Sequence, residues 1–203
     1  MAARVRKRPA APASTPAERA RKAARVEKPR FPLTTSRPEL LVGGSDAEFR
    51  HLVHGLFGFL ARHERIRAGH ARVIGLAGIE YTVLISIAHL STGGDVSVKR
   101  VADHLHLSGA FITSTVRRLV QLGLVHKKTS TADRRQVTLT VLLKGDSLLE
   151  RLAPTQRQVN DAEFGCLSRE EFRSLVRIVD QLIDSGDAAV ALQSYLLSQM
   201  GAG

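Results

Sequence analysis

The sequence predicts a mainly α-helical fold with one small β-hairpin, organised as a winged helix-turn-helix with a helical dimerisation region at its two ends. Three observations predict this class. Two short amphipathic segments follow each other closely between residues 97 and 122, a glycine follows the second one, and two β-prone runs come next. This order is typical of units that hold one helix in the major groove of DNA. Double-stranded DNA is therefore the expected partner.

The two short segments carry their own start and stop signals. Ser97 can cap the first segment and Ser108 the second, with His106 and Leu107 forming the turn between them. Apolar residues recur in both segments at helical spacing. In the second segment the positions expected to face inward are Ile112, Val116, Leu119 and Val120.

The other positions of the second segment suit contact with DNA. Short side chains near its start allow the backbone to approach base edges, while Ser, Thr and Arg can bond to bases or phosphates. An Arg can also bridge O6 and N7 of guanine. The candidate DNA-contacting residues of this segment are Ser108, Ala110, Phe111, Thr113, Ser114, Arg117 and Arg118.

A hairpin with a basic tip is expected after this helix. Gly123 ends the helix as a left-handed cap, and residues 124–128 and 136–141 have the pattern of two strands. Val137, Leu139 and Val141 fall on one face of the second strand. Arg134 and Arg135, in the polar run between the strands, are expected to contact phosphates or the minor groove.

The run LVQLGLVHKKTSTADRRQVTLTVLLKG resembles the wing signature of the MarR family of bacterial transcription regulators. In that signature a Gly-Leu-Val step leads to an Asp-Arg-Arg tip and a Leu-Thr-rich return strand. Upstream, LAGIEYTVL resembles the family's Leu-Thr-x-x-Gln-aromatic-x-Val-Leu helix, although Ala77 replaces the usual Thr and Glu80 the usual Gln. Ser114 stands where many members carry Arg. The matching wing and recognition-helix residues are Thr113, Leu119, Gly123, Leu124, Val125, Asp133, Arg134, Arg135 and Gly145.

The resemblance implies a domain organisation for the whole chain. Residues 1–38 are rich in Ala and Arg with few large apolar residues, and this composition predicts a disordered basic tail. The resemblance makes residues 39–203 a single MarR-like domain. Within that domain, residues 76–145 would be the winged helix-turn-helix lobe. Residues 39–75 and 146–203 would supply the dimerisation helices, because the family dimerises through its terminal helices.

The terminal segments also predict helices on their own. Residues 46–68 form an amphipathic helix capped by Ser45 or Asp46, and residues 76–90 form a second helix. Pro154 is expected to kink or break a helix over residues 144–160. Ser168 and Glu171 form a capping box for a helix that runs to residue 183, and a last short helix covers residues 188–200. Their apolar stripes favour a homodimer over an ordinary monomeric core, which is the alternative.

Charge is concentrated in two parts of the chain, whose formal net charge is +11. Residues 1–38 hold 11 Lys or Arg and 2 Glu, a net charge of +9. Residues 97–145 hold 9 Lys or Arg and 2 Asp, a net charge of +7, while the remaining residues carry −5. Positive charge on the tail and on the reading unit fits DNA. The tail is either an arm that binds phosphates without sequence preference or an uninvolved solvated extension.

Composition excludes several other classes. A single cysteine, Cys166, rules out a disulfide framework within one chain and fits a reducing cytoplasm. No apolar run approaches the roughly 18 residues of a membrane span, and no hydrophobic signal core follows the basic start. Catalytic triads, phosphate loops and nucleotide fingerprints are missing, so neither an enzyme nor a cofactor is expected. Cys166 has opposing charges nearby and is expected to be an inert thiol.

An unusual set of histidines and glycines occupies the first helix and suggests a sensing site. A cavity with room left by glycine and with imidazole and guanidinium donors at its rim would suit a small planar anion, and the family commonly binds aromatic acids. Close helix packing is the alternative reading of the glycines, and a metal site is the competing reading of the histidines, without Cys neighbours or a zinc motif to support it. The candidate ligand-binding residues are His51, His54, Gly58, Arg62, His70 and Tyr81.

Taken together, these features predict a cytoplasmic, homodimeric repressor that reads a specific DNA sequence and is released by a small aromatic or heteroaromatic acid. Two other functions remain open. The chain could be a DNA-architectural or accessory protein that binds without sequence preference through its tail and wing, or a winged-helix module for protein interaction. Thr113, Ser114 and Arg117 favour specific reading, because these side chains are expected to face the bases.

Overall fold

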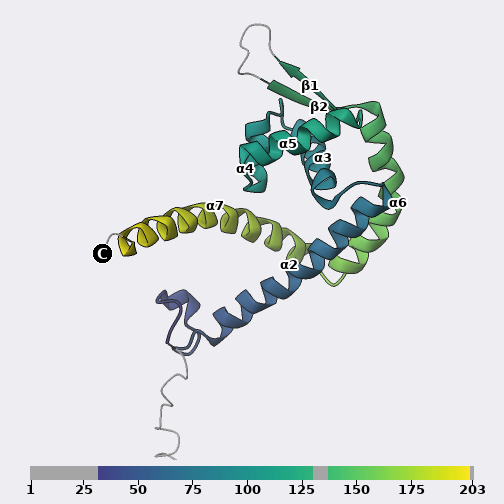
Figure 1. Ribbon diagram of the computed structural model, residues 1–203. Helices are drawn as coiled ribbons and strands as arrows, with labels where there is room; N and C mark the ends of the chain where they lie inside the picture. Colours follow the sequence, from purple (N-terminus) through teal and green to yellow (C-terminus); the bar gives the residue numbers. More distant parts are fainter. Residues whose placement is uncertain (1–31, 130–136, 202–203) are drawn as a thin grey trace, which may run out of the picture. The chain divides into compact units, whose positions relative to one another are not determined.

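The computed structural model describes residues 32–129 and 137–201, and the chain divides into two compact units, residues 1–60 and 61–203. Figure 1 shows a mainly helical chain with one small hairpin, as the sequence predicts. The described elements are η1 (Pro38–Leu40), α2 (Ala47–Val73), α3 (Gly78–Ser91), α4 (Val98–Leu105), α5 (Gly109–Gln121), β1 (Val125–Thr129), β2 (Val137–Val141), α6 (Leu143–Phe164) and α7 (Arg169–Met200).

In the first unit, a buried carboxylate ties the segment before α2 to the start of that helix. Thr34 donates from its backbone N and from Oγ1 to Asp46 Oδ2, at 2.8 and 2.7 Å. Arg50 Nη1 lies 2.6 Å from Asp46 Oδ1. The two hydrogen bonds from Thr34 hold the pKa of Asp46 below its usual range. Ser45 Oγ accepts from Ala47 N at 3.2 Å, so the first backbone N–H of α2 has a side-chain partner just before the helix.

Helix α2 is longer than the sequence predicts, because it continues past Ala68 to Val73. Ala71 is completely buried in the hydrophobic core, so the last turns are stabilised by packing in spite of Gly69. The helix ends at the turn before Gly75, whose φ of 73° is the left-handed conformation that glycine adopts readily.

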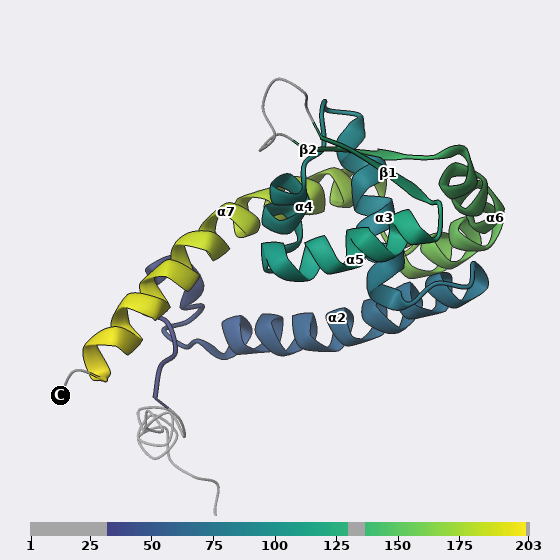
Figure 2. The ribbon, with the colours of Figure 1, turned by 45° about the horizontal axis from the view of Figure 1, so that its top comes forward.

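The winged helix-turn-helix elements form the hydrophobic core of the second unit. Helix α3 packs against α5 and β2, and α4 packs against α5 (Figure 2). The centre of this core is made of fully buried side chains, among them Leu84, Ile87, Val101, Ile112, Leu119 and Leu139. One inward prediction was wrong: Val120 is 39% exposed, while Thr115 is 7% exposed and takes the inward position.

Both predicted caps and the predicted turn are confirmed. Ser97 Oγ accepts from Arg100 N at 3.1 Å, and Ser108 Oγ accepts from Phe111 N at 3.2 Å. His106 ends α4 in the left-handed region with a φ of 50°, and Gly123 follows α5 with a φ of 70°. The turn at His106 therefore lies between α4 and α5, and the left-handed conformation of Gly123 ends α5 as the sequence predicts.

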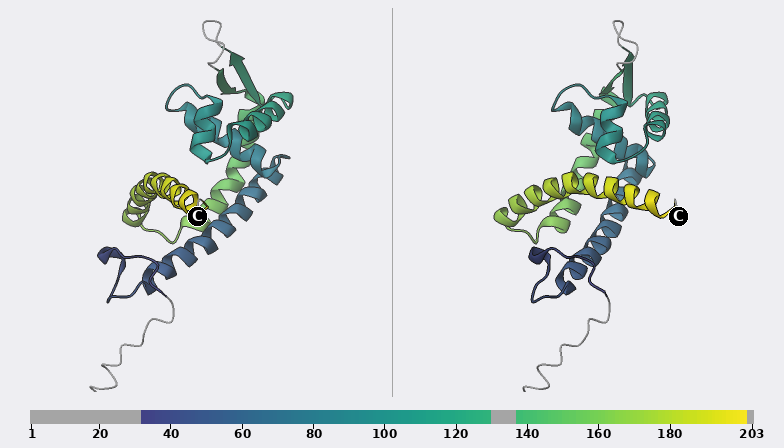
Figure 3. Two further views of the ribbon diagram at one scale, coloured as in Figure 1. Left: turned by 60° about the vertical axis from the view of Figure 1, so that its left-hand side comes forward. Right: turned by 90° about the vertical axis from the view of Figure 1, so that its left-hand side faces the viewer.

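The hairpin is antiparallel, with Val125 opposite Val141 and Lys127 opposite Leu139. Leu139 is 2% exposed, and Val137 and Val141 pack partly buried beside the core, so the predicted apolar face is confirmed. Leu139 N donates to Val96 O at 2.8 Å, which attaches the segment before α4 to the outer side of β2. Figure 3 shows the hairpin extending beyond the helices of this unit.

Pro154 was expected to kink or break the helix after the wing, and the break does not occur. Helix α6 continues through Pro154 from Leu143 to Phe164. Proline removes one backbone hydrogen bond, but side-chain contacts hold both halves of α6. Before the proline, Leu152 is completely buried; after it, Gln156 Nε2 donates to the Tyr81 hydroxyl at 3.2 Å.

The prediction of two C-terminal helices was also wrong, because α7 is one helix of 32 residues. Residues 184–187 are Asp-Ser-Gly-Asp, which contains no proline, and a Cβ added at Gly186 would meet nothing within 4 Å. A helical glycine costs about 1 kcal/mol but does not end a helix. The predicted capping box is confirmed, with Ser168 N donating to Glu171 Oε2 and Glu171 N to Ser168 Oγ.

Within the described ranges, no single helix is long and apolar enough to cross a membrane. One bent pair, α2 with α3, passes the same test by length and composition.

Candidate functional site

Helix α5 presents the exposed face that the sequence predicts as the DNA reader. Ala110, Phe111, Ser114 and Arg117 are exposed, and Thr113 is half-buried. The opposite side is anchored by buried Ile112, Val116 and Leu119, which fixes the helix on the core. The face therefore combines small residues near the start of the helix with hydroxyl and guanidinium groups further along.

Two hydroxyls on this face already have backbone partners. Thr113 Oγ1 donates to Gly109 O at 2.7 Å, and Ser108 Oγ accepts the capping bond from Phe111 N. Each oxygen retains capacity for a further hydrogen bond, because a hydroxyl both donates and accepts. Their partners hold them in defined orientations at the end of α5 that approaches base edges in a helix-turn-helix.

The two arginines of α5 differ in their surroundings. Arg117 is exposed, whereas Arg118 Nε lies 3.5 Å from Glu80 Oε1 of α3, with the Arg118 side chain 57% exposed. A guanidinium with an acidic partner is less available to DNA than one without. Arg117 is therefore the stronger candidate for base contact, in line with the expectation from the sequence that its side chain faces the bases.

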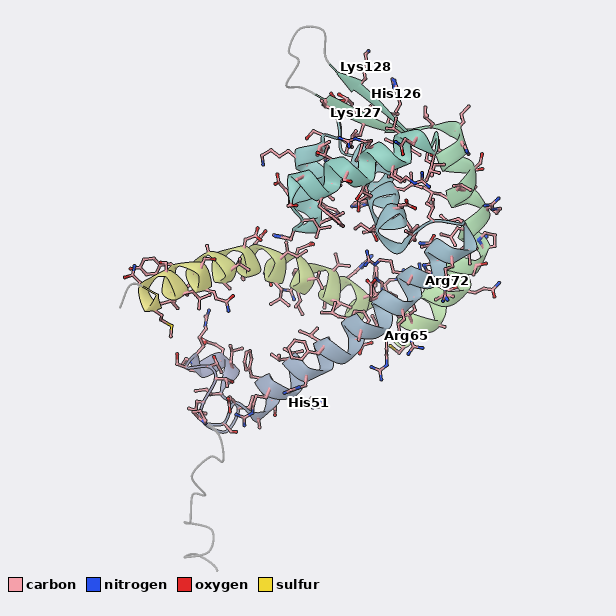
Figure 4. The ribbon with its side chains drawn as sticks, viewed as in Figure 1. His51, Arg65, Arg72, His126, Lys127 and Lys128 are labelled. Carbon is pink, nitrogen blue, oxygen red and sulfur yellow. The ribbon has the colours of Figure 1, made fainter. Side chains whose placement is uncertain are left out.

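The hairpin adds basic side chains that the sequence analysis did not name. His126, Lys127 and Lys128 of β1 are exposed, and Figure 4 shows them on the hairpin above α5. Their signal was the run HKK inside the first strand. Arg134 and Arg135, the predicted tip contacts, lie outside the described residues.

A hollow of about 520 Å³ lies between the start of α4 and the strands of the hairpin. It combines hydroxyls with two lysines, Lys99 and Lys127, and Lys99 Nζ is held 2.6 Å from Asp103 Oδ2. Its position connects the reading helix with the wing. The lining residues are Asp95, Val96, Ser97, Val98, Lys99, Thr113, Lys127, Val137 and Thr138.

Two predicted ligand residues, His70 and Tyr81, meet in the core instead of at an open rim. Their ring centroids are 6.1 Å apart in an edge-to-face arrangement, with His70 6% and Tyr81 3% exposed. Burial lowers the pKa of His70 and raises the pKa of Tyr81. His70 Nε2 is buried without a hydrogen-bond partner, so the neutral imidazole is the favoured form.

Arg62, a third predicted ligand residue, lines a groove of about 840 Å³ in the second unit. Two further arginines of α2, Arg65 and Arg72, line the same groove, and both are labelled along that helix in Figure 4. The rest of the lining is small or apolar: Ile66, Ala68, Leu76, Ala77 and Gly78. The sequence analysis missed Arg65 and Arg72, although their spacing from Arg62 follows the helical repeat.

The other predicted ligand residues, His51, His54 and Gly58, belong to the first unit. His51 and His54 are exposed, and the ring of His54 lies 5.8 Å from that of Phe57 in an edge-to-face arrangement. Within residues 32–129 and 137–201, no group of three His, Cys, Asp or Glu side chains is placed to hold a metal ion. Cys166 is exposed in the loop between α6 and α7.

Comparisons with known proteins point to one family. A family model described as "MarR family" matches residues 74–136, which include α3, α4, α5 and β1. The HTH-type transcriptional regulator MhqR of Bacillus subtilis is 31% identical over 102 residues, which cover 50% of this chain and 68% of that protein.

Solved structures show the same fold at low sequence identity. A MarR mutant from E. coli complexed with operator DNA has a TM-score of 0.55 at 16% identity, covering 66% of this chain and 95% of that one. Bordetella bronchiseptica BpsR, from a study of how 6-hydroxynicotinic acid regulates its DNA binding, has a TM-score of 0.53 at 24% identity, covering 64% and 91%.

Proposed function

The chain belongs to the MarR family of winged-helix transcriptional regulators, and on that basis we propose that it is a dimeric cytoplasmic repressor which reads a specific DNA sequence and is released by a small aromatic or heteroaromatic acid. The observation that carries the proposal is the exposed face of α5. Its base-reading residues would be Thr113, Ser114 and Arg117, on a helix whose opposite side is fixed in the core. Phosphate contacts would come from Lys127, Lys128, Arg134 and Arg135.

Dimerisation is supported by apolar side chains that remain exposed in a single chain. Helix α7 has no buried residue, and its large apolar side chains are 37–80% exposed. Association along a two-fold axis would bury such stripes and place two recognition helices about one DNA turn apart. The exposed apolar residues of α7 are Phe172, Leu175, Val176, Ile178, Val179, Leu182, Ile183, Val190, Leu192, Tyr195, Leu196, Leu197 and Met200.

The groove beside Arg62 is the best-supported place for an acidic effector. Its volume of about 840 Å³ falls within the range of small-molecule sites, roughly 300–1,000 Å³. Arginines suit a carboxylate because the guanidinium can bond to both oxygens, and Ile66 and Leu76 offer an apolar wall for a ring. BpsR, a structural neighbour, is regulated by a heteroaromatic acid of this kind. His51, His54, Gly58, His70 and Tyr81 remain candidate residues with weaker support.

Release of DNA requires that the acid binds the DNA-incompetent arrangement more tightly than the competent one. An acid between α2 and the start of α3 touches the scaffold that carries α5. Because paired half-sites tolerate little error in the separation of two recognition helices, a small rotation is sufficient.

The DNA half of the proposal is tested with two arginine variants. Arg117→Ala should lose preference at one base pair, by about 1–3 kcal/mol if the contact is bidentate. Arg135→Ala should weaken binding to all DNA sequences equally. It should also reduce the slope of log affinity against log salt concentration by about one charge. Fluorescence anisotropy on a DNA fragment selected in vitro, at several salt concentrations, measures both. If the wild-type chain binds every sequence equally, it is a non-specific DNA-architectural protein.

The effector half is tested by calorimetry with salicylate, cinnamate and 6-hydroxynicotinate. Arg62→Ala should weaken binding of the acid that wild type accepts, while His51→Ala and His54→Ala should change it little. The reverse pattern would place the site on the histidine side of α2. If wild type binds none of these acids, the acid effector class is wrong.

A further inference from the structure

One carboxylate in the second unit joins the edge of the arginine groove to the recognition helix. Glu80 Oε2 accepts a hydrogen bond from Ala77 N at 2.9 Å, and Glu80 Oε1 lies 3.5 Å from Arg118 Nε. Ala77 and Gly78 line the groove, and Arg118 belongs to the last turn of α5. We propose that Glu80 is the positioning residue that couples occupancy of this groove to the placement of α5.

The two contacts use different oxygens of one side chain that is only 16% exposed. An exposed ion pair contributes little, because both side chains reorient freely in water. Here the Glu80 carboxylate accepts a hydrogen bond from the backbone at the start of α3, so the carboxylate moves when Ala77 moves. A displacement of the Ala77–Gly78 wall is therefore passed to Arg118.

The partner of Glu80 sits at a sensitive point of α5. Arg118 O accepts from Leu122 N at 3.0 Å in the C-terminal turn, next to buried Leu119. Arg117, the proposed base-reading arginine, is its neighbour in sequence. Loss or shift of the Glu80 contact changes the restraint on the end of α5 that follows the reading residues.

Charge gives the coupling a direction. The groove holds three arginines, and Glu80 is the carboxylate hydrogen-bonded to its wall. A bound acid adds a second negative group beside that wall, and like charges repel. The acid would therefore push the Glu80 side chain from its position between Ala77 and Arg118. The sequence departure at this site fits the role, because Gln, the residue typical of the family here, could accept from Ala77 N but would carry no charge.

The inference rests on the proposed acid effector, and its test separates the two. Operator Kd is measured by anisotropy for the full chain with and without salicylate or 6-hydroxynicotinate, and the ratio of the two values is compared between variants. Acid binding is measured separately by calorimetry. Glu80→Gln keeps the acceptor for Ala77 N and removes the charge. Glu150→Gln, an exposed carboxylate of α6, is the matched control.

Coupling between two sites is typically about 5–150-fold in affinity, so wild type should show an acid-dependent ratio in that range. In Glu80→Gln the ratio should fall to about twofold or less, while acid affinity stays close to wild type and Glu150→Gln behaves as wild type. Combining Glu80→Gln with Arg118→Gln should reduce the ratio no further than Glu80→Gln alone, because both substitutions break one contact.

Three results would overturn the inference. If Glu80→Gln binds the acid and keeps the wild-type ratio, the coupling is wrong while the effector proposal stands. If the double variant falls well below either single variant, the two residues act separately. If no acid binds wild type, the effector proposal fails and the coupling fails with it.

Discussion

Gly145 is the position where a single added carbon has the clearest expected consequence. A Cβ at Gly145 would lie 2.7 Å from Leu124 O and 2.7 Å from Val141 Cγ1. Non-bonded carbon atoms prefer about 3.5–4.0 Å, so Gly145→Ala forces the start of α6 away from the base of the hairpin. Leu124 O also accepts from Leu142 N at 2.9 Å, so this displacement strains the hydrogen bond that closes the hairpin.

The expected loss is about 1–3 kcal/mol of unfolding free energy, the usual range for overpacking in a well-packed core. The better helix propensity of alanine offsets only part of it, up to about 1 kcal/mol. Because Val141 ends β2, the wing should also tilt, and operator affinity should fall at temperatures where the variant is fully folded. Urea unfolding followed by circular dichroism measures the first effect, and anisotropy with operator DNA the second.

Gly69→Ala is the matched control for Gly145→Ala. Gly69 lies inside α2, and a Cβ there would meet nothing within 4 Å. The same substitution should therefore stabilise the chain by about 0.5–1 kcal/mol at this site. If the close contacts at Gly145 decide the outcome, the free energy of unfolding falls for Gly145→Ala and rises for Gly69→Ala. A Gly145→Ala variant at least as stable as wild type, with unchanged operator affinity, would refute it.

Three further predictions follow from the described contacts and the charge distribution. Residues 1–31 hold 10 Lys or Arg and 2 Glu, and their deletion leaves Thr34 in place. The deletion should weaken non-specific DNA binding most at low salt, as measured by anisotropy titrations. If the dependence of affinity on salt is unchanged, the tail takes no part in DNA binding. Burial lowers the pKa of His70, so the contribution of the neutral imidazole to stability is complete above its unfolded pKa of about 6.5 and is lost as the pH falls through the lower folded value. Below about pH 6.5 the free energy of unfolding in urea should therefore fall less for His70→Phe than for wild type. Thr34→Val removes the hydrogen bond from Thr34 Oγ1 to Asp46, which lowers the pKa of Asp46. Hydrogen exchange of the backbone amides of residues 32–46 should therefore be faster than in wild type at neutral pH. The two rates should become equal once acid has protonated Asp46.

Local signals explain what the sequence predicted well. Ser97, Ser108 and Ser168 cap their helices as expected, and Gly123 adopts the left-handed conformation. Each of these features is decided within three or four residues by hydrogen bonds or by the missing Cβ of glycine. The winged helix-turn-helix order followed from them without knowledge of any long-range contact.

Long-range contacts explain what the sequence could not predict. Helix α6 continues through Pro154, and Gln156 just after it donates to Tyr81, a residue 75 positions away in the chain. The pair of Arg118 with Glu80 likewise joins residues that no periodicity relates. The groove arginines Arg62, Arg65 and Arg72 share one helix, and the sequence predicted only Arg62 of the three as a ligand residue.

The stability of α7 is not explained by contacts within a single chain. Within its own chain, α7 has an exposed pair of Asp187 Oδ1 with His106 Nε2 at 3.2 Å, and such a pair contributes little. A helix of 32 residues without a buried side chain must therefore draw most of its stability from propensity or from a surface outside the chain. Propensity is a poor source here, because β-branched residues such as Ile178 and Ile183 and the glycine at position 186 lower it. A second copy is the source that the proposed dimer supplies. Unfolding of α7 should then depend on protein concentration, with helical content falling on dilution before the core around Leu84 unfolds. If α7 keeps its helical content in a demonstrably monomeric sample, the helix is stabilised within the chain and the dimer must be held by other elements.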